Sequence, residues 1–294
     1  MKKTIFVALL GGLVTGSTLA DTTVNKTIDA SDDGVVSISN VAGSIEVVAW
    51  SRSAVKVEGT LGDDVDELIF ERDGDEVTVK VKVPRHHGRD IDSDIVVSVP
   101  KDSSLEVSGV SADIEVEGVL GEQEVATVSG DVTIKGSAAD VEAASVSGDV
   151  EVRGTNADTE TEVATVSGDL TLKGLAGEIE AESVSGDVTI TDGSFDDAYT
   201  ESVNGDLTFH AELRKGGDLG MESINGTVDV ILNGTISAEF DIETFNGSIK
   251  CCFGPKPERT SRYSPGLELS FTKGDGDGSV VIETLNGSVR ICDE

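Results

Sequence analysis

Apolar and polar residues alternate along most of this chain in short runs. Val36-Ser37-Ile38-Ser39 and Glu76-Val77-Thr78-Val79-Lys80-Val81 are early examples, and Val132-Thr133-Ile134 is typical of the later ones. Alternation with a period of two residues is the pattern of a β-strand that has one buried face. Beyond the first twenty residues no segment is continuously apolar. The pattern therefore predicts an all-β protein.

From residue 127 onwards the alternation belongs to a repeat that is marked by a glycine. Residues 127–134 (TVSGDVTI) recur at 145–152 (SVSGDVEV). A small polar residue followed by Gly is typical of a tight turn, or of a bend with a positive φ angle. The marker glycines lie 18, 20, 18, 19, 21 and 21 residues apart up to Gly247, and the last step, to Gly287, is 40 residues. In chain order they are Gly130, Gly148, Gly168, Gly186, Gly205, Gly226, Gly247 and Gly287.

A unit of this length cannot bury a core by itself, so successive units have to stack. Because the same residue types recur at the same phase, we predict a parallel β-solenoid, similar to a single-stranded β-helix, built of repeats of roughly 18–21 residues. Antiparallel hairpins are the alternative. In the solenoid, the apolar residues two positions after each marker glycine stack as an internal row. They are Val132, Val150, Leu170, Val188, Leu207, Val228, Ile249 and Val289.

The first twenty residues are typical of a secretory signal peptide. Lys2 and Lys3 precede an apolar run at 5–14, and small residues lie before Asp21. The run is shorter than the roughly 20 residues that span a bilayer. The residue directly after the cleavage point is not Cys, and no hydrophobic tail ends the chain, so we expect neither a lipid anchor nor a transmembrane segment. The sequence predicts export to the periplasm or cell surface, with attachment only through a partner.

The remaining chain divides into two predicted regions. Residues 21–101 contain strands without the regular repeat, and residues 102–294 contain the solenoid with an insertion at 253–272. An open terminal coil exposes unpaired backbone and core side chains, so the first region is predicted to be an N-terminal β cap. Cap and solenoid are expected to form one continuous body.

Acidic residues dominate the charge. The chain has 56 Asp and Glu against 22 Lys and Arg, a formal net charge of −34, and loss of the signal peptide with its two lysines makes the balance more negative. Such a surface repels nucleic acid and anionic lipid and attracts cations, basic peptides and basic protein faces. The alternative is that the charge only keeps a long β-protein soluble.

The order of several motifs resembles one bacterial family. VSISNVAGSIEVVAW at 36–50 is followed by VKV at 55–57, by VVSVP at 96–100 and then by the Ser-Gly-Asp repeats. This order is similar to that of the toastrack proteins, a family of unknown function labelled as candidate adhesins. The resemblance implies a β-strand-repeat fold on exported or envelope-associated proteins, some of them linked to envelope stress, and it implies no catalytic residues.

Two rows of acids offer candidate chemistry. One lies directly after the marker glycines and the other four positions before them. Stacked about 4.8 Å apart, neighbouring carboxylates repel by roughly 1 kcal/mol per pair in water. A solvated row whose Asp side chains bond their own turns is one interpretation, and low-affinity Ca²⁺ binding is the other. The first row is Asp131, Asp149, Asp169, Asp187 and Asp206, and the second is Glu182, Glu201, Glu222, Glu243 and Glu283.

The three cysteines lie near the end of the chain. Cys252 and Cys292 both follow a marker glycine by five residues. If the 40-residue step is one coil with an insertion, the two become neighbours and can form a disulfide in an exported compartment, whereas an extra coil between them forbids it. Cys251 is expected to be a buried apolar residue.

Two basic segments stand out in this acidic chain. Residues 254–265 interrupt the repeat, and long insertions in solenoids often meet partners. We therefore predict a contact site for an envelope or surface protein or a glycan at Lys256, Arg259, Arg262 and Tyr263. The segment from Arg85 to Arg89, with His86 and His87, reads as a solvated loop or, alternatively, as a metal ligand pair.

The leading prediction is an exported, non-enzymatic envelope protein that acts as an adhesin-like binding or structural module without a cofactor. The competing interpretations are a β-helix enzyme acting on polysaccharides and a Ca²⁺-responsive envelope-stress sensor. The enzyme is disfavoured because aromatic residues that could stack on sugars are scarce and because the acids repeat in rows instead of converging with a base. Four asparagines match the glycosylation pattern, Asn225, Asn233, Asn246 and Asn286, but three of the four lie in the same repeat turn, so turn chemistry explains them better.

Overall fold

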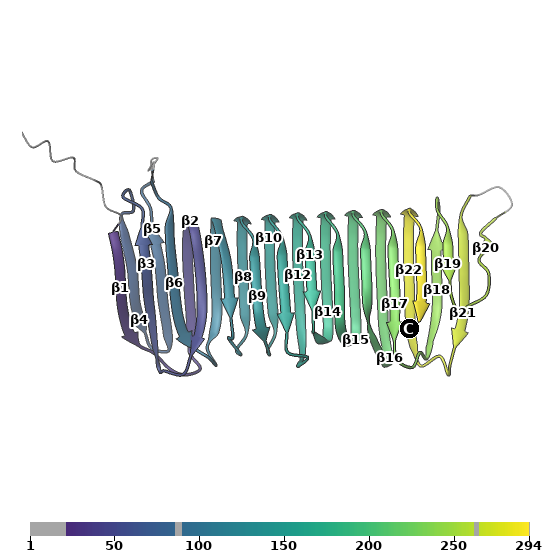
Figure 1. Cartoon of the computed structure of the whole chain (residues 1–294), viewed down its shortest axis with the longest axis horizontal. Coiled ribbons are helices and arrows are strands. Elements are labelled where there is room, and N and C mark those ends of the chain that lie inside the picture. The colour runs from purple at the N-terminus through teal and green to yellow at the C-terminus, as the bar shows by residue number, and fades with distance from the viewer. Residues whose placement is uncertain (1–21, 86–89, 262–264, 294) are drawn as a thin grey trace, which may run out of the picture.

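The computed structural model describes residues 22–85, 90–261 and 265–293. Within them it contains 23 strands and no helix, and most strand pairs of the repeat region are parallel. Figure 1 shows the strands side by side along one long axis, with turns in line at each edge. The all-β parallel solenoid predicted from the repeat is confirmed. Within the described ranges, no helix has the length and apolar character needed to cross a membrane.

Each rung of the stack consists of two strands that meet at a marker glycine. β8 (Gln123–Ser129) leads through Gly130 into β9 (Val132–Ser137), and the next rung is β10 (Val141–Ser147) followed by β11 (Val150–Gly154). β10 pairs in parallel with β8, and β11 pairs in parallel with β9. The strands before the glycines therefore form one face, the pre-glycine face, and those after them form the other, the post-glycine face.

The two faces extend along the stack in the following spatial order. The pre-glycine face contains β8, β10, β12 (Asp158–Ser167), β14 (Ala176–Ser185), the second half of β15 (Val188–Asn204), the second half of β16 (Leu207–Asn225), β22 (Gly278–Asn286) and β18 (Ala238–Thr244). The post-glycine face contains β9, β11, β13 (Leu170–Lys173), the first halves of β15 and β16, β17 (Val228–Asn233), β23 (Val289–Asp293) and β19 (Ile249–Cys251).

The core lies between the two faces. The predicted aliphatic row is buried at every position from Val132 to Val289, and neighbouring members pair directly, as Val150 does with Leu170. The marker glycines are required by close approach: a Cβ on Gly148 would lie 1.9 Å from the carbonyl oxygen of Gly130. The backbone at Gly148 does not have the positive φ that the turn pattern offered as one explanation.

At the C-terminal end the rungs no longer stack in the order in which they occur along the chain. β22 pairs with β16 on one side and with β18 on the other, and β23 lies between β17 and β19. After β17 the chain skips one rung position, builds the outer rung of β18 and β19, and then returns to fill the skipped position. We call β22 and β23 the interpolated rung. In Figure 1 the yellow β22 lies between green strands that precede it in the chain.

The N-terminal end is closed by strands that leave the parallel pattern. β2 (Val35–Trp50) pairs in parallel along its length with β7 (Ser104–Glu117) and so follows the path of a rung. β5 (Glu76–Lys82) and β6 (Ser93–Pro100) stack on the two halves of β2. The outermost strands are antiparallel: β4 (Glu67–Asp73) pairs with β5, β3 (Ala54–Leu61) with β6, and β1 (Thr22–Asp29) with β3. The boundary at residue 101 stays a prediction.

The C-terminal end is closed in a similar way. β21 (Leu267–Lys273) pairs antiparallel with β18, and the short β20 (Glu258–Arg259) pairs antiparallel with β21. Three aromatic rings gather beneath them: Phe240 lies 4.7 Å from Phe271 and 5.6 Å from Phe253, centroid to centroid. Much of the predicted insertion at 253–272 thus belongs to the end of the stack.

Candidate functional site

Carboxylates cover the pre-glycine face because alternate strand residues point to the same side. On β14, Glu178, Glu180 and Glu182 are exposed, whereas the intervening Ile179 and Ala181 are buried. In-register pairing then places each acid beside the equivalent residue of the next rung. The result is a set of rows that run along the stack, across the strands.

Two of these rows are long. The turn-proximal row, four positions before the marker glycines, includes the predicted Glu residues and continues onto β21. The central row lies six positions before the marker glycines in four rungs and extends to Glu106 through its pairing with Glu124; it was not predicted, although the glycine alignment contains those four residues. In spatial order, the turn-proximal row is Glu182, Glu201, Glu222, Glu283, Glu243 and Glu268, and the central row is Glu106, Glu124, Glu142, Glu162 and Glu180.

The two Glu rows of the pre-glycine face are not compensated by bases. From β8 to β18, all within the described residues, the strand segments that hold these rows contain no Lys, Arg or His, whereas Arg214, between the two halves of β16, pairs with Asp158 and Asp196 outside the rows. The post-glycine face differs, because its charges are paired: Lys135 with Glu115, and Arg290 Nη1 with Asp229 Oδ1 at 2.8 Å. The solenoid therefore has one strongly negative face and one nearly balanced face.

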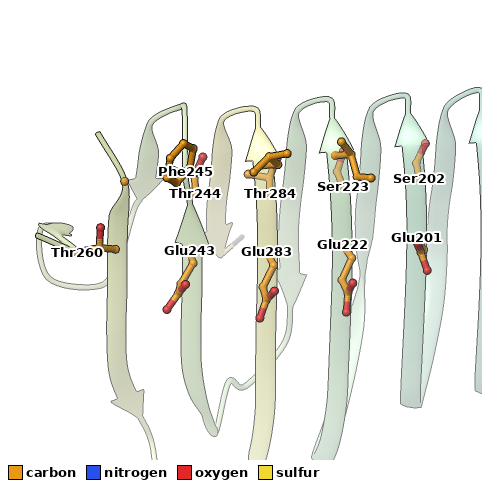
Figure 2. Close-up of a pocket in the computed structure, with 13 residues that line it drawn as sticks. Glu201, Ser202, Glu222, Ser223, Glu243, Thr244, Phe245, Thr260, Glu283 and Thr284 are labelled. Carbon is orange, nitrogen blue, oxygen red and sulfur yellow. The ribbon is translucent and has the colours of Figure 1, made fainter. Parts of the chain in front are cut away.

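A hollow of about 330 Å³ lies over the C-terminal part of the turn-proximal row. Its floor is acidic, and apolar side chains border it toward the turns. Thr260 and Gly266, next to β20 and β21, line it as well. We call it the acidic groove; its principal residues are Glu201, Glu222, Glu283, Glu243, Ile224, Leu285 and Phe245. Figure 2 shows the four glutamates in line, one per strand, with Glu283 of the interpolated rung between Glu222 and Glu243.

The negative charge changes the protonation of groups within the rows. Burial raises the pKa of Tyr199 to about 12, and the carboxylates of Glu222 and Glu201 add to this effect. Partial desolvation raises the pKa of Glu180 above its ordinary value, and repulsion from Glu182 and Glu162 adds to the shift. Both shifts disfavour the negatively charged form, and a bound cation would oppose them, because a nearby positive charge stabilises the deprotonated form.

The predicted Asp row has a structural role in the turns. Each Oδ1 accepts a hydrogen bond from the backbone N–H of the equivalent residue in the next rung: Asp131 from Asp149 at 2.9 Å and Asp149 from Asp169 at 2.8 Å. The Asp side chains thus accept hydrogen bonds from the turn of the next rung. The interpretation from the sequence had each Asp bonding its own turn. In the described ranges, no group of three or more His, Cys, Asp or Glu is arranged to hold a metal ion. Calcium binding at Asp131, Asp149, Asp169, Asp187 and Asp206 stays a prediction.

A ladder of asparagine side chains follows the spatial order of the rungs at the C-terminal end. The side-chain amide of Asn246 donates to Asn286, that of Asn286 to Asn225, and that of Asn225 to Asn204, each at 3.0 Å. These asparagines precede marker glycines, so their interaction supports turn chemistry as the reason for the Asn-Gly-Ser/Thr pattern. It also holds the interpolated rung to both of its neighbours.

The family model described as Toastrack DUF4097 matches residues 35–291. This chain belongs to the Toastrack family. The match begins at the first residue of β2 and ends in β23, so it includes the interpolated rung. No sequence among the curated proteins matches the chain.

Several solved structures are similar to this toastrack chain at low identity and low TM-score. A "putative adhesin" from Bacteroides fragilis has 10% identity and a TM-score of 0.49, with 92% of this chain and 98% of that chain covered. A "putative lipid binding protein" from Parabacteroides distasonis has 14% identity and a TM-score of 0.40, with 92% and 96% covered. A "putative adhesin" from Parabacteroides merdae has 11% identity and a TM-score of 0.36, with 92% and 99% covered.

The cysteines of this toastrack chain meet at the interpolated rung. Cys252, just after β19, and Cys292 of β23 form a disulfide with a Cα–Cα distance of 4.9 Å. They are neighbours because β23 lies beside β19, which is the adjacency that the pairing required. Cys251 is half-buried against the core, and its Sγ accepts a hydrogen bond from the Gly254 N–H at 3.1 Å.

The basic residues predicted to contact a partner do not form one described cluster. Lys256 is exposed, and Arg259 lies in β20 at the end of the toastrack array. Arg262 and Tyr263 lie outside the described residues, as do His86 and His87 and the predicted signal peptide. A role of the 254–265 segment in partner contact stays a prediction.

Proposed function

We propose that this toastrack protein is an exported, non-enzymatic binding module of the cell envelope, and that its acidic groove and pre-glycine face hold a cationic partner. The observation that carries the proposal is the difference between the two faces. From β8 to β18, the strand segments that hold the two Glu rows contain no Lys, Arg or His, so the carboxylates repel one another along the stack, and a basic partner relieves this repulsion. A cover that served only solubility would place acids on both faces alike.

A binding role is favoured over catalysis by the arrangement of the acids. The groove glutamates are equivalent residues of successive rungs and lie in nearly equal surroundings. Acid and base catalysis needs two groups whose environments push their pKa values apart. Equivalent carboxylates in a row instead provide a repeated, uniform surface, which suits an extended ligand. Adhesin-like attachment to a basic face of an envelope protein is such a use.

Binding of poly-lysine to the exported form, residues 21–294, tests the proposal. We expect poly-lysine to bind and poly-glutamate not to bind, with affinity falling steeply as salt is raised, because the attraction between exposed charges is screened. The decisive variant is E201Q/E222Q/E283Q/E243Q, which neutralises the acidic groove. A matched control, D32N/D33N/D63N/D66N, removes the same charge from exposed positions near the N-terminal end.

The groove variant should lose most of the affinity, and the control variant should keep it. Equal losses in both variants would show that net charge alone attracts the polymer, which contradicts a built site. A parallel titration with millimolar Ca²⁺ tests the competing Ca²⁺-responsive interpretation. A rise in thermal stability that the groove variant abolishes would favour a metal site over a polypeptide partner.

A further inference from the structure

A row of exposed apolar side chains runs along the turn edge of the stack. It consists of the residues two positions before the marker turns, so every rung contributes one. We call it the apolar ridge; in spatial order it is Val110, Val128, Val146, Val166, Val184, Val203, Ile224, Leu285 and Phe245. All members but the half-buried Val203 are exposed, by 43% for Ile224 up to 50% for Phe245.

The fold does not require these side chains to be apolar. The preceding residue of each rung points inward, as Ser183 and Ser202 do, and the core is complete without the ridge. Single exposed apolar residues on a surface are ordinary, but a contiguous apolar row usually marks an interaction site. Nine rungs at a spacing of about 4.8 Å give a ridge about 38 Å long. An interaction surface of this length calls for an elongated partner.

Carboxylates border the ridge. The Asp row lies on the far side of the marker glycines from Val128 to Val203, and the turn-proximal Glu row lies on the near side from Val184 to Phe245. Ile224, Leu285 and Phe245 also line the acidic groove. A second copy of this chain would bring acid against acid, and so would an anionic bilayer. The complementary partner has an apolar stripe bordered by Lys and Arg.

The rung spacing distinguishes a helical partner from an extended one. The apolar stripe of an amphipathic helix presents one turn about every 5.4 Å, whereas side chains on one face of a strand recur about every 6.7 Å. The pitch of the helix exceeds the rung spacing by about 0.6 Å, so after four turns the side chains of the helix are displaced from the ridge side chains by about half a rung. A strand loses register within two steps.

We propose that the apolar ridge docks a cationic amphipathic α-helix, with Ile224, Leu285 and Phe245 as the main anchors. These three are the larger side chains of the ridge and lie where it meets the acidic groove, so the inference rests in part on the proposed function. The Lys and Arg residues that flank the stripe of the helix contact the turn-proximal Glu row. The helix thus lies along the stack, across the strands.

The test uses a fluorescent 18-residue peptide of Leu and Lys arranged in the helical period. A control peptide has the same composition with Leu and Lys alternating. The ridge variant is I224T/L285T/F245T, and the matched control is V281T/L120T, which removes two exposed apolar side chains outside the ridge. We expect the ridge variant to weaken binding of the helical peptide by at least about tenfold, equal to about 1.4 kcal/mol. The ridge variant should keep the thermal stability of the unaltered protein, and the control variant should bind the helical peptide with unaltered affinity.

Wild-type affinity of the ridge variant for the helical peptide overturns the inference, and poly-lysine binding would then still support the proposed function. Binding of the helical peptide without any binding of poly-lysine would support the apolar ridge as a docking site and contradict the proposed function. If the alternating peptide binds more strongly than the helical one, the partner is an extended strand and the inference of a helix is wrong. If the free protein sediments as a dimer and the ridge variant does not, the ridge binds a second copy of the chain and the inference is overturned. If the protein floats with phosphatidylglycerol vesicles and the ridge variant does not, the ridge binds a membrane, which also overturns the inference.

Discussion

The disulfide between Cys252 and Cys292 fastens the interpolated rung, and its removal should loosen that rung specifically. The two cysteines are 40 residues apart. The chain-entropy relation for a closed loop of that length gives about 4 kcal/mol of stabilisation at 25 °C, as an upper value. The variant C252S/C292S is the suitable change, because a single substitution leaves a thiol that can pair with Cys251.

The rest of the rung should hold without the disulfide. β22 still pairs with β16 and β18, and Val280, Ile282, Val289 and Ile291 remain in the core. We therefore expect a folded protein whose interpolated rung opens more readily, by about 2 to 4 kcal/mol.

Hydrogen exchange measured by mass spectrometry resolves the opening of each rung, which one global transition of a repeat array does not. Faster exchange is expected in 278–293 and in the strands on either side, with 123–173 unchanged. C251S, which leaves the disulfide intact, is the control. Equal exchange of 278–293 in the double variant and in the unaltered protein would refute the reasoning.

Three further outcomes are expected. Ile282→Ala should cost about 2 to 5 kcal/mol in urea unfolding, because the side chain is fully buried, whereas Val281→Ala on the exposed side should change stability by less than about 0.5 kcal/mol. The pKa of Glu180 is raised in the fold, so its charged form destabilises the protein above the ordinary Glu pKa of about 4.3. Glu180→Gln should therefore raise the melting temperature at pH 7 and have no effect at pH 4; an equal gain at both pH values contradicts this cause. Intact mass of the protein exported from a bacterial host should correspond to a chain that begins at Asp21, and an uncleaved leader contradicts the predicted signal peptide.

The fold was predictable because the repeat is local. Val132, Val150 and their equivalents recur at one phase, and phase decides which residues stack. Phase does not decide the order in which rungs stack. The motif at Gly287 fits equally well outside or inside the rung of Gly247, and the chain places it inside. The 40-residue step indicated an irregularity without giving its direction.

The site was only partly predictable. The turn-proximal glutamates were identified from the glycine alignment, but their meeting in the acidic groove depends on Glu283 entering between Glu222 and Glu243. The apolar ridge was missed although the alternation contains it. On β8, Val125 and Thr127 are buried whereas Glu124 and Val128 are exposed, so Val128 lies on the exposed side and the alternation ends only at Ser129.

The interpolated rung also limits how such an array can change in length during evolution. Up to Asn225 the rungs stack in chain order, so the gain or loss of a whole repeat there lengthens or shortens the stack and leaves every other contact in place. A repeat duplicated after Gly247 has no such freedom, since the last strand pair must still reach the position between β16 and β18. Growth of this protein is therefore confined to its middle, and the C-terminal end is inherited as one unit.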